Sequence, residues 1–248
     1  MTASQPRNGD ERPGTPRLLV AVAVAAEAEA VLRGLRDGAR PVPLDVGELR
    51  RSEHASGAEV DVLVAGVGPT AAAVSVAAVL AQHPYDLVVS AGIAGGFVPR
   101  APIGTIVLAD EIVVADLGAQ TPEGFRDVAA LGFGSIRYTP SPGAVRLAAD
   151  ALDAATGTVL TVSTVTGSAE RAEELTARHP HAVAEAMEGY GVAEAAARYR
   201  VPVLELRTVS NAVGPRDRDA WRIGEALGAL ERAFVLLPYR ELVEEVSR

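Results

Sequence analysis

The chain has 248 residues, of which 48% are hydrophobic, and it carries a formal net charge of −9. This acidic balance lacks the basic surface that binding to a phosphate backbone requires, so nucleic acid is not an expected partner. Because the chain has no cysteine and all 23 of its basic residues are arginine, disulfides, thiolate metal sites, cysteine nucleophiles and lysine Schiff bases are excluded.

The first residues differ in composition from the rest of the chain. Residues 1 to 16 are polar and rich in proline and glycine, which predicts a disordered leader, and residues 17 to 248 are expected to form a single domain. No apolar run reaches the roughly 18 residues needed to span a bilayer, and no apolar signal core is present near the N-terminus. No membrane association and a cytoplasmic location are therefore expected.

Near-continuous apolar runs alternate with helix-like stretches along the chain. Strands are predicted at residues 18–24, 60–66, 86–92, 105–110, 158–163 and 201–210. Helices are predicted at 26–37, 69–82, 142–155, 168–178 and 183–199, followed by a last one at 219–246 that Pro238 should break or kink. The pattern indicates an α/β protein, a three-layer α/β/α sandwich around a largely parallel, mixed central sheet. In such folds ligands bind beyond the carboxyl ends of the strands.

Two glutamates interrupt stripes that should face the interior. With helical spacing from residue 25, Glu29 lies on the apolar face, whereas Glu27 points elsewhere; similarly Glu188 lies on a face of small residues, and Glu185 and Glu194 can be solvated. An inward carboxylate must be paired, hydrogen-bonded or open to a cleft. For either glutamate alone, a structural role and a catalytic role remain equally open.

Small residues end several of the predicted strands. GVGPTA at residues 66–71 has the form of a dinucleotide fingerprint, but its proline removes an N–H and the expected acidic partner is absent, so a plain turn is favoured. AGIAGGF at residues 91–97 lets the backbone approach a ligand closely, although, taken alone, a structural turn is the favoured interpretation. Ser210 and Asn211 place two polar side chains where an apolar strand stops, which favours a site there.

The segments in this order resemble the purine nucleoside phosphorylase and nucleosidase superfamily, in particular its methylthioadenosine/S-adenosylhomocysteine nucleosidase branch. The resemblance covers residues 18 to 236, and its most specific part is AMEG followed by RTVSN about twenty residues later. The other segments are AVAAEAEAVL (23–32), AGVGPTAAA (65–73), SAGIAGGF (90–97), IGTIVLADE (103–111) and TGSAE (166–170).

The resemblance implies a role for each matching residue. Glu29 matches the acid that positions and activates the attacking water, and Asn211 matches the position that recognises the base. Met187 and Glu188 match the pair that packs on the ribose and binds its hydroxyls, and Gly95 lies in the loop that approaches the ribose. These roles suit the chemistry, because N-glycosidic cleavage develops positive charge on the ribose and proceeds more easily when N7 of the purine is protonated.

Asn211 departs from the family pattern, since the adenine-specific nucleosidases have aspartate there. An amide can donate to O6 of a 6-oxopurine while its carbonyl accepts from N7–H, whereas a carboxylate can only accept. The amide therefore predicts a preference for hypoxanthine or guanine over adenine. Ser210, beside it, is expected to contribute to the same binding site.

The wall of the base pocket also departs from the family pattern. Thr164 stands where the nucleosidases have a stacking phenylalanine, and Thr164 and Val165 are expected to contact the substrate. Stacking on the base must then come from elsewhere, with Phe97 and Trp221 as the open alternatives. Ala186 replaces an acid that the adenine-specific branch often has, which implies a reshaped pocket.

The nucleophile is expected to be water, because the phosphorylases carry arginines in their phosphate-binding loops and the matching loops here have none. Together these departures resemble the futalosine hydrolase branch, which removes hypoxanthine from futalosine on a route to menaquinone. The alternatives are a methylthioadenosine-type nucleosidase, a phosphate-dependent 6-oxopurine phosphorylase and a non-catalytic nucleoside-binding protein. The resemblance implies a small nucleoside as the substrate, no metal or organic cofactor, and a homo-oligomer, either a dimer or a dimer-based tetramer.

Overall fold

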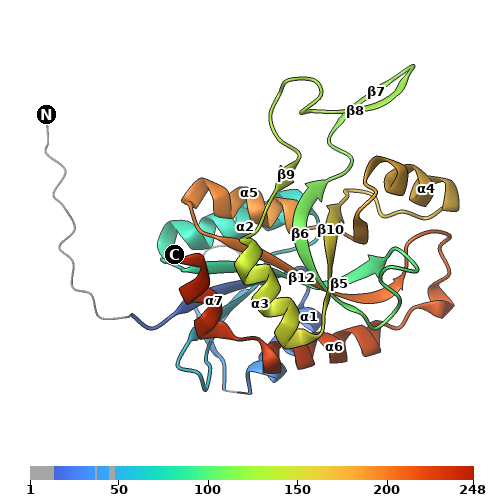
Figure 1. Ribbon diagram of the computed structural model, residues 1–248. Coiled ribbons are helices and arrows are strands. Elements are labelled where there is room, and N and C mark those ends of the chain that lie inside the picture. The colour runs from blue at the N-terminus through green and yellow to red at the C-terminus, as the bar shows by residue number, and fades with distance from the viewer. Residues whose placement is uncertain (1–13, 37, 45–47) are drawn as a thin grey trace, which may run out of the picture.

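The computed structural model describes residues 14–36, 38–44 and 48–248, and a large sheet forms its centre (Figure 1). The strands are β1 (Arg17–Val22), β2 (Arg40–Val42), β3 (Glu48–Glu53), β4 (Glu59–Val64), β5 (Leu87–Gly96), β6 (Ile106–Val114), β7 (Gly118–Thr121), β8 (Gly124–Asp127), β9 (Arg137–Tyr138), β10 (Ala155–Thr161), β11 (Ala182–Ala186) and β12 (Val203–Ala212). The helices are α1 (Ala25–Leu35), α2 (Pro69–Gln82), α3 (Pro142–Leu152), α4 (Ala169–Arg178), α5 (Gly189–Tyr199), α6 (Ile223–Leu236) and α7 (Tyr239–Val246).

The main sheet has the strand order β11-β10-β6-β12-β5-β1-β4-β3-β2, with β9 paired to β6. Its central pairs β12–β5, β5–β1 and β1–β4 are parallel, and β12–β6 and β3–β4 are antiparallel. A further antiparallel pairing joins β11 to the end of β5, so that one part of the sheet curls round and closes on itself. This closure brings the ends of β5, β11 and β12 together.

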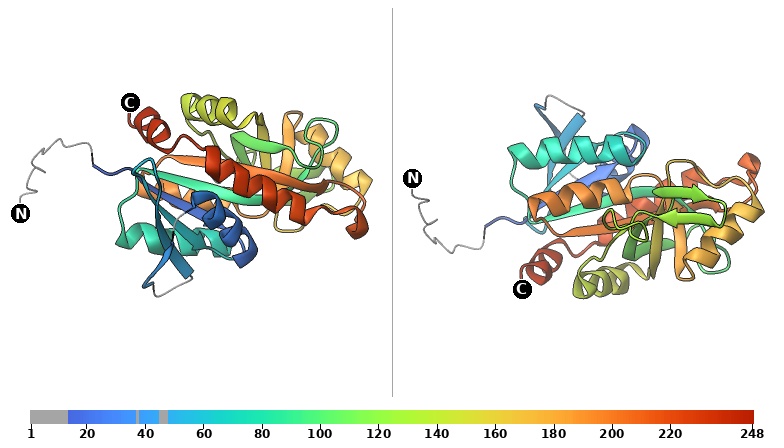
Figure 2. Two further views of the ribbon diagram at one scale, coloured as in Figure 1. Left: turned by 90° about the horizontal axis from the view of Figure 1, so that it is seen from below. Right: turned by 90° about the horizontal axis from the view of Figure 1, so that it is seen from above.

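Alternate side chains of β1 pack on opposite faces of the sheet, in two separate hydrophobic cores. Leu18 and Val20 of β1 pack in the core with α1, α3, α6 and α7, whereas Leu19 and Ala21 pack in the core with α2 and α5. Figure 2 shows the two covering layers, with α6 in front of the sheet in the view from below and α5 in front of it in the view from above. The predicted three-layer α/β/α fold with a largely parallel, mixed sheet is confirmed.

The strands predicted from apolar runs all form, as β1, β4, β5, β6, β10 and β12. The predicted helix at 183–199 is wrong in its first part, where β11 occupies Ala182–Ala186 and α5 begins only at Gly189. Alanine and glutamate favour helix by themselves, but backbone pairing of β11 with both β10 and β5 overrides that preference. The short strands β2, β3, β7, β8 and β9 have no long apolar run and were not predicted.

The C-terminal segment follows the prediction at Pro238, because α6 ends at Leu236 and α7 starts at Tyr239. The predicted start at residue 219 was too early, since a short 3-10 turn at Arg218–Ala220 precedes α6. Of the predicted leader, residues 1–13 lie outside the described residues.

Candidate active site

Glu27 lies at the junction between β1 and α1, with its carboxylate directed at the end of the sheet. Its Oε2 accepts hydrogen bonds from the backbone N–H groups of Ala23 (2.9 Å) and Val24 (3.2 Å), and its Oε1 accepts from Ile93 N–H (2.9 Å) in β5. The first N–H groups of a helix have no partner within the helix, and a glutamate in the first turn can reach back to satisfy them. The side chain is 3% exposed and therefore held firmly in one place.

The predicted orientations of Glu27 and Glu29 are wrong. Glu29 is 54% exposed and forms an ion pair with Arg50 of β3 at 2.5 Å. Helical periodicity identifies the side of α1 that packs on the sheet, and Ala28, Val31 and Leu32 occupy that side. A site beyond the strand ends lies along the helix axis instead, where only a residue of the first turn can reach it.

Glu188 is buried, as the sequence predicted, although it lies in the turn before α5 rather than on a helix face. Its Oε1 accepts from Gly68 N–H at 3.2 Å, and its Oε2 accepts from Arg207 Nη1 at 3.3 Å. Gly68 follows β4 and Arg207 belongs to β12. The carboxylate therefore joins two strand ends that are far apart in the sequence.

Arg207 is a site residue that sequence reasoning did not single out. It is 1% exposed within β12, where its Nε donates to Glu205 at 2.9 Å and its Nη2 donates to Ser90 at 3.2 Å, in addition to the bond with Glu188. A sequence signal was available, because Glu205 and Arg207 are two charged residues on one face of an otherwise apolar strand.

Charges in this cluster perturb one another. Burial raises the pKa of Glu27, and the neighbouring Glu188 carboxylate raises it further, against the lowering effect of the Ile93 N–H group and the Arg207 guanidinium. Burial alone would lower the pKa of Arg207, but the carboxylates of Glu205, Glu188 and Glu27 raise it. A carboxylate with a raised pKa is a stronger base than an ordinary one, as general-base catalysis requires.

Gly92 of β5 creates the space for this cluster. A Cβ atom at Gly92 would lie 2.5 Å from Glu27 Oε1 and 3.0 Å from Arg207 Nη1. Only glycine allows the backbone to approach both side chains so closely. The close approach of Glu27 and Arg207 therefore explains on steric grounds why this stretch of small residues has glycine at position 92.

Asn211 lies near the far end of β12, beside a small cavity of about 80 Å³. Its Oδ1 is 2.8 Å from Ser210 Oγ, and its Nδ2 donates to the carbonyl of Ala212 at 2.9 Å. These contacts leave one amide hydrogen and one lone pair of the side chain for a ligand. The cavity is lined by Gly95, Val165, Thr166, Glu185, Asn211, Ala212, Val213, Gly214, Pro215, Arg216 and Trp221.

Glu185 enters this cavity although it was expected to be solvated. It is 6% exposed, and it accepts hydrogen bonds from Thr166 N–H at 2.8 Å and from the Thr166 hydroxyl. Burial raises the pKa of Glu185 above its ordinary value, and the two hydrogen bonds from Thr166 offset only part of that rise. The expectation failed because residue 185 was assigned to a helix, whereas β11 places it in register with Gly95.

Some of the remaining residues that were predicted to contact the substrate line the cavity, and others lie outside it. Val165 lines the cavity, whereas Thr164 is exposed and is not part of the wall. Met187 is half-buried, and in the sequence it lies between the two buried acids Glu185 and Glu188. Of the two aromatic residues considered for stacking, Phe97 is buried in a hydrophobic core. Trp221 lines the cavity.

Two strands connect the cavity with the buried charge cluster. In the register of β5 and β12, Arg207 pairs with Gly92 and Asn211 pairs with Gly95. Three residues of extended strand span about 10 Å. A whole nucleoside is of comparable length, so one such molecule can extend from one region toward the other.

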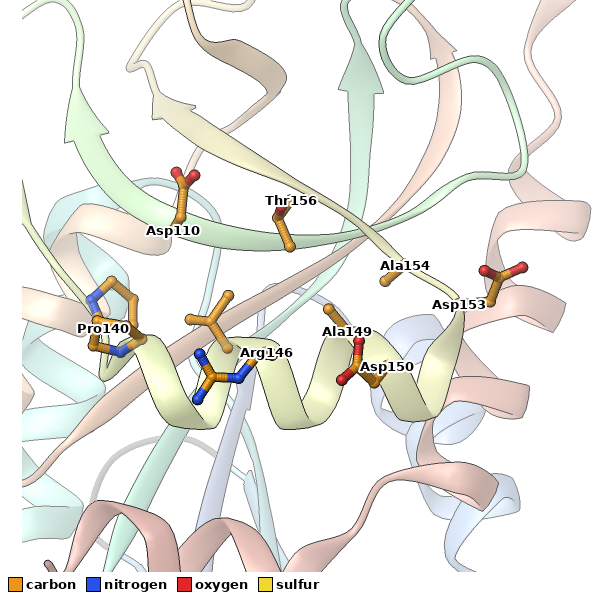
Figure 3. A pocket seen from close by; sticks show the side chains of 10 residues that line it. Asp110, Pro140, Arg146, Ala149, Asp150, Asp153, Ala154 and Thr156 are labelled. Carbon is orange, nitrogen blue, oxygen red and sulfur yellow. The ribbon is translucent and has the colours of Figure 1, made fainter.

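A wider cavity, of about 540 Å³, lies elsewhere, along α3 and the start of β10 (Figure 3). Asp110, Arg146, Asp150 and Asp153 surround it, and none of the residues of the two regions described above lines it. Asp110 is exposed. The candidate active site is therefore the region at the strand ends and not this cavity.

A third, more apolar cavity of about 400 Å³ lies between α2 and α5. Val74 and Leu117 line it and are 58% and 43% exposed. Among the described residues, every helix is too short or too polar to span a bilayer. Within the same part of the chain, no three histidine, cysteine or acidic side chains are grouped in a way that could hold a metal ion.

Comparisons with known proteins identify the family of the chain. A family model described as the phosphorylase superfamily matches residues 17–234. The chain is 57% identical to a futalosine hydrolase of Streptomyces coelicolor, an alignment that covers 87% of this chain and 92% of the relative. It is 49% identical to a futalosine hydrolase of Acidothermus cellulolyticus, with 88% and 89% covered.

Solved structures show the same fold at lower identity. A methylthioadenosine/S-adenosylhomocysteine nucleosidase of Helicobacter pylori, crystallised with an inhibitor, has a TM-score of 0.79 at 19% identity and covers 94% of this chain and 99% of its own. A futalosine hydrolase of the same organism has a TM-score of 0.75 at 17% identity, with 94% and 97% covered.

Proposed function

The chain belongs to the phosphorylase superfamily and hydrolyses the N-glycosidic bond of futalosine, and we propose that Glu27, Glu188 and Asn211 carry out this reaction. The products are hypoxanthine and dehypoxanthine futalosine, which places the enzyme in menaquinone biosynthesis. The observation that supports the assignment of residues is the alignment of two regions along β5 and β12, with the buried acids beside Gly92 and the amide beside Gly95, three residues further along the strand.

Glu27 is the general base in this proposal. Its carboxylate is fixed by three backbone N–H groups, and its pKa is raised by burial, so that it can accept a proton from water at neutral pH. Water attacks the anomeric carbon, the bond from that carbon to the purine nitrogen breaks, and the bonding electrons leave with the base. Glu27 takes over the role that the sequence resemblance gave to Glu29.

Glu188 binds the ribose hydroxyls and stabilises the positive charge that develops on the ribose ring. It is suited to this because its two hydrogen bonds, to Gly68 N–H and Arg207 Nη1, are both long and leave lone pairs open. A negative charge beside an oxocarbenium-like transition state lowers the barrier more than it stabilises the neutral substrate.

Asn211 recognises the base. Its free amide hydrogen donates to O6 of hypoxanthine. N7 takes up a proton from solvent as the bond breaks, Glu27 returns its proton to solvent, and the Asn211 carbonyl accepts a hydrogen bond from the new N7–H, so that the purine leaves as a neutral molecule. Trp221 and Val165 contact the substrate from the cavity wall. An amide in place of an acid thereby selects a 6-oxopurine over adenine.

The test compares two glutamates two residues apart in α1. In phosphate-free buffer the unmodified protein should release hypoxanthine from futalosine, and Glu27→Gln should lower kcat/KM by about 10²- to 10⁴-fold. Glu29→Gln is the matched control and should retain near-full activity, because within the described part of the chain Glu29 is an exposed residue paired with Arg50. Full activity of Glu27→Gln, or a requirement for phosphate, would overturn the proposal.

We also propose that the protein is a homo-oligomer that buries the apolar wall of the cavity between α2 and α5. Val74 and Leu117 are large apolar side chains at this wall, and a partner subunit would remove them from water. The single domain at 17–248 and the cytoplasmic location stay predictions.

A further inference from the structure

Glu205 is a buried carboxylate for which the reaction as described has no use. It is 0% exposed in the middle of β12, and its only hydrogen bond among the described residues is the one that Oε1 accepts from Arg207 Nε at 2.9 Å. Oε2 has no partner there. Burial of a carboxylate with one oxygen unsatisfied is costly, so a purely structural residue at this position would be expected to be apolar.

The chain reserves space for this carboxylate at a second position. A Cβ atom at Gly189 would lie 2.2 Å from Glu205 Oε1 and 2.3 Å from Oε2. Gly189 is the first residue of α5, where alanine would be a better helix former. Glycine at 189 is therefore explained by the carboxylate at 205 and not by the backbone.

Groups from four elements surround the Arg207 guanidinium that Glu205 holds. Glu205 binds Nε, Glu188 from the turn before α5 lies 3.3 Å from Nη1, and Ser90 of β5 accepts from Nη2 at 3.2 Å. Glu27 of α1 interacts with Arg207 through its charge. One guanidinium thus stands among three carboxylates.

The bond from Nε to Glu205 has a geometric effect. Because the guanidinium is planar and rigid, fixing Nε also fixes the directions of Nη1 and Nη2. Without Glu205, Arg207 could turn toward Glu27 or Glu188 and bind their oxygens in place of water or ribose. Its whole positive charge would then act on the two acids.

We propose that Glu205 is a positioning residue for catalysis, which fixes the plane of the Arg207 guanidinium and offsets its positive charge beside Glu27 and Glu188. The inference rests on the proposed roles of Glu27 and Glu188. It adds that the strength of Glu27 as a general base is set by a residue that does not contact the substrate.

Glu205→Gln tests the effect of the charge, since it keeps the shape of the side chain and an oxygen for Arg207 Nε. With the negative charge removed, Arg207 favours the ionised form of Glu27 more strongly. The acidic limb of the kcat/KM profile for futalosine should move to lower pH by about half a unit to one unit, and kcat at neutral pH should fall by about tenfold, because a weaker base removes a proton less well. Glu231→Gln, which removes a carboxylate from a surface pair with Arg33, should change neither.

Gly189→Ala tests the same contact from the other side. The added methyl group displaces the Glu205 carboxylate, so activity and Tm should both fall. The double variant G189A/E205A relieves the clash, and it should regain Tm while kcat stays low and the pH profile stays shifted. A merely structural role for Glu205 predicts instead that activity returns together with Tm.

The outcomes distinguish failure of the positioning role of Glu205 from failure of the catalytic role of Glu27. The positioning role is overturned if folded Glu205→Gln has the kcat and pH profile of the unmodified enzyme, or if G189A/E205A recovers full activity. Should Glu205→Gln not fold, the double variant decides by the same criterion. An active Glu27→Gln variant would instead overturn the assignment of Glu27 as the general base.

Discussion

Two glutamates of α1, which are chemically identical, differ entirely in environment. Glu27 accepts three backbone hydrogen bonds at the end of the sheet, whereas Glu29 pairs with Arg50 at the surface. The difference arises from position, because a side chain in the first helical turn can fold back past the helix end. A residue's distance from the helix terminus therefore decided its role more than its place on the helical wheel.

The pH dependence of the reaction should reflect the raised pKa of Glu27. The base must be ionised to act, so activity is lost as the pH falls through the pKa of Glu27 in the folded protein. Since that pKa is raised above the ordinary value of 4.5, the acidic limb of the kcat/KM profile should lie above pH 4.5. The profile for futalosine hydrolysis measures this, and a limb at or below that pH would contradict a raised pKa at the base.

Asn211→Asp should change the preference for the base. A carboxylate faces O6 of hypoxanthine with a lone pair, but it can accept from the N6 amino group of adenine. We expect kcat/KM for futalosine to fall by about 10²-fold or more, and cleavage of aminofutalosine to rise relative to futalosine. Competition between the two substrates measures the ratio. An unchanged ratio would mean that another residue recognises position 6.

At the scale of elements, β5 and β12 determine the geometry of the site. Their parallel register places Gly92 beside Arg207 and Gly95 beside Asn211, while β11 brings Glu185 alongside Gly95 from the other side. The irregular register after Val209 lies immediately before Asn211. Such irregularities re-aim side chains, and they are frequent near active sites.

Gly92→Ala should disturb β5 at the point where it approaches Glu27. The added methyl group would lie 2.5 Å from Glu27 Oε1, so the carboxylate must move, and a displacement of about 1 Å costs about 10²-fold in rate. Gly224→Ala is the control, since no atom lies within 4 Å of its added Cβ. Kinetics with futalosine should show the loss for Gly92→Ala alone, and equal activities would contradict a tight approach of β5.

On the scale of the whole molecule, the two cores on either side of the sheet hold the strand ends in place. Phe234 of α6 is fully buried in the core that also contains α1, and α1 approaches it so closely that a Cβ at Gly34 would lie 2.8 Å from Phe234 Cβ. Packing of α6 on α1 thus supports the helix that carries Glu27.

Phe234→Ala should therefore be strongly destabilising. Removing a buried aromatic ring costs about 3–5 kcal/mol in the free energy of unfolding, through lost burial and the cavity that remains. Leu236→Ala, in the same helix at 57% exposure, should cost much less. Urea denaturation of both variants provides the comparison, and similar midpoints would argue against a tightly packed contact between α6 and α1.

The proposed oligomer can be tested at the apolar cavity between α2 and α5. Val74→Glu would place a charge on a surface that we propose a second subunit covers. Sedimentation should show an oligomer for the unmodified protein and smaller species for the variant. A monomer before the substitution, or no change after it, would contradict this surface as the interface.

Local sequence determined a large part of this protein by itself. Long apolar runs specified β1, β4, β5, β6, β10 and β12, because a strand buried on both faces needs apolar side chains throughout. Pro238 specified a helix break, since it cannot donate the backbone hydrogen bond that a continuous helix requires. The motifs around Glu188 and Asn211 indicated a nucleoside-cleaving enzyme, and the relatives carry that function.

Only the tertiary structure decided which acids lie in the candidate site. The segment at Ala182–Ala186 favours helix locally, yet pairing with β10 and β5 makes it a strand and turns Glu185 inward. Glu27, and not Glu29, lies in the candidate site together with Arg207 and Glu205, because segments remote in sequence converge on one point. Periodicity describes how one element faces its neighbours, whereas an active site depends on where several elements end.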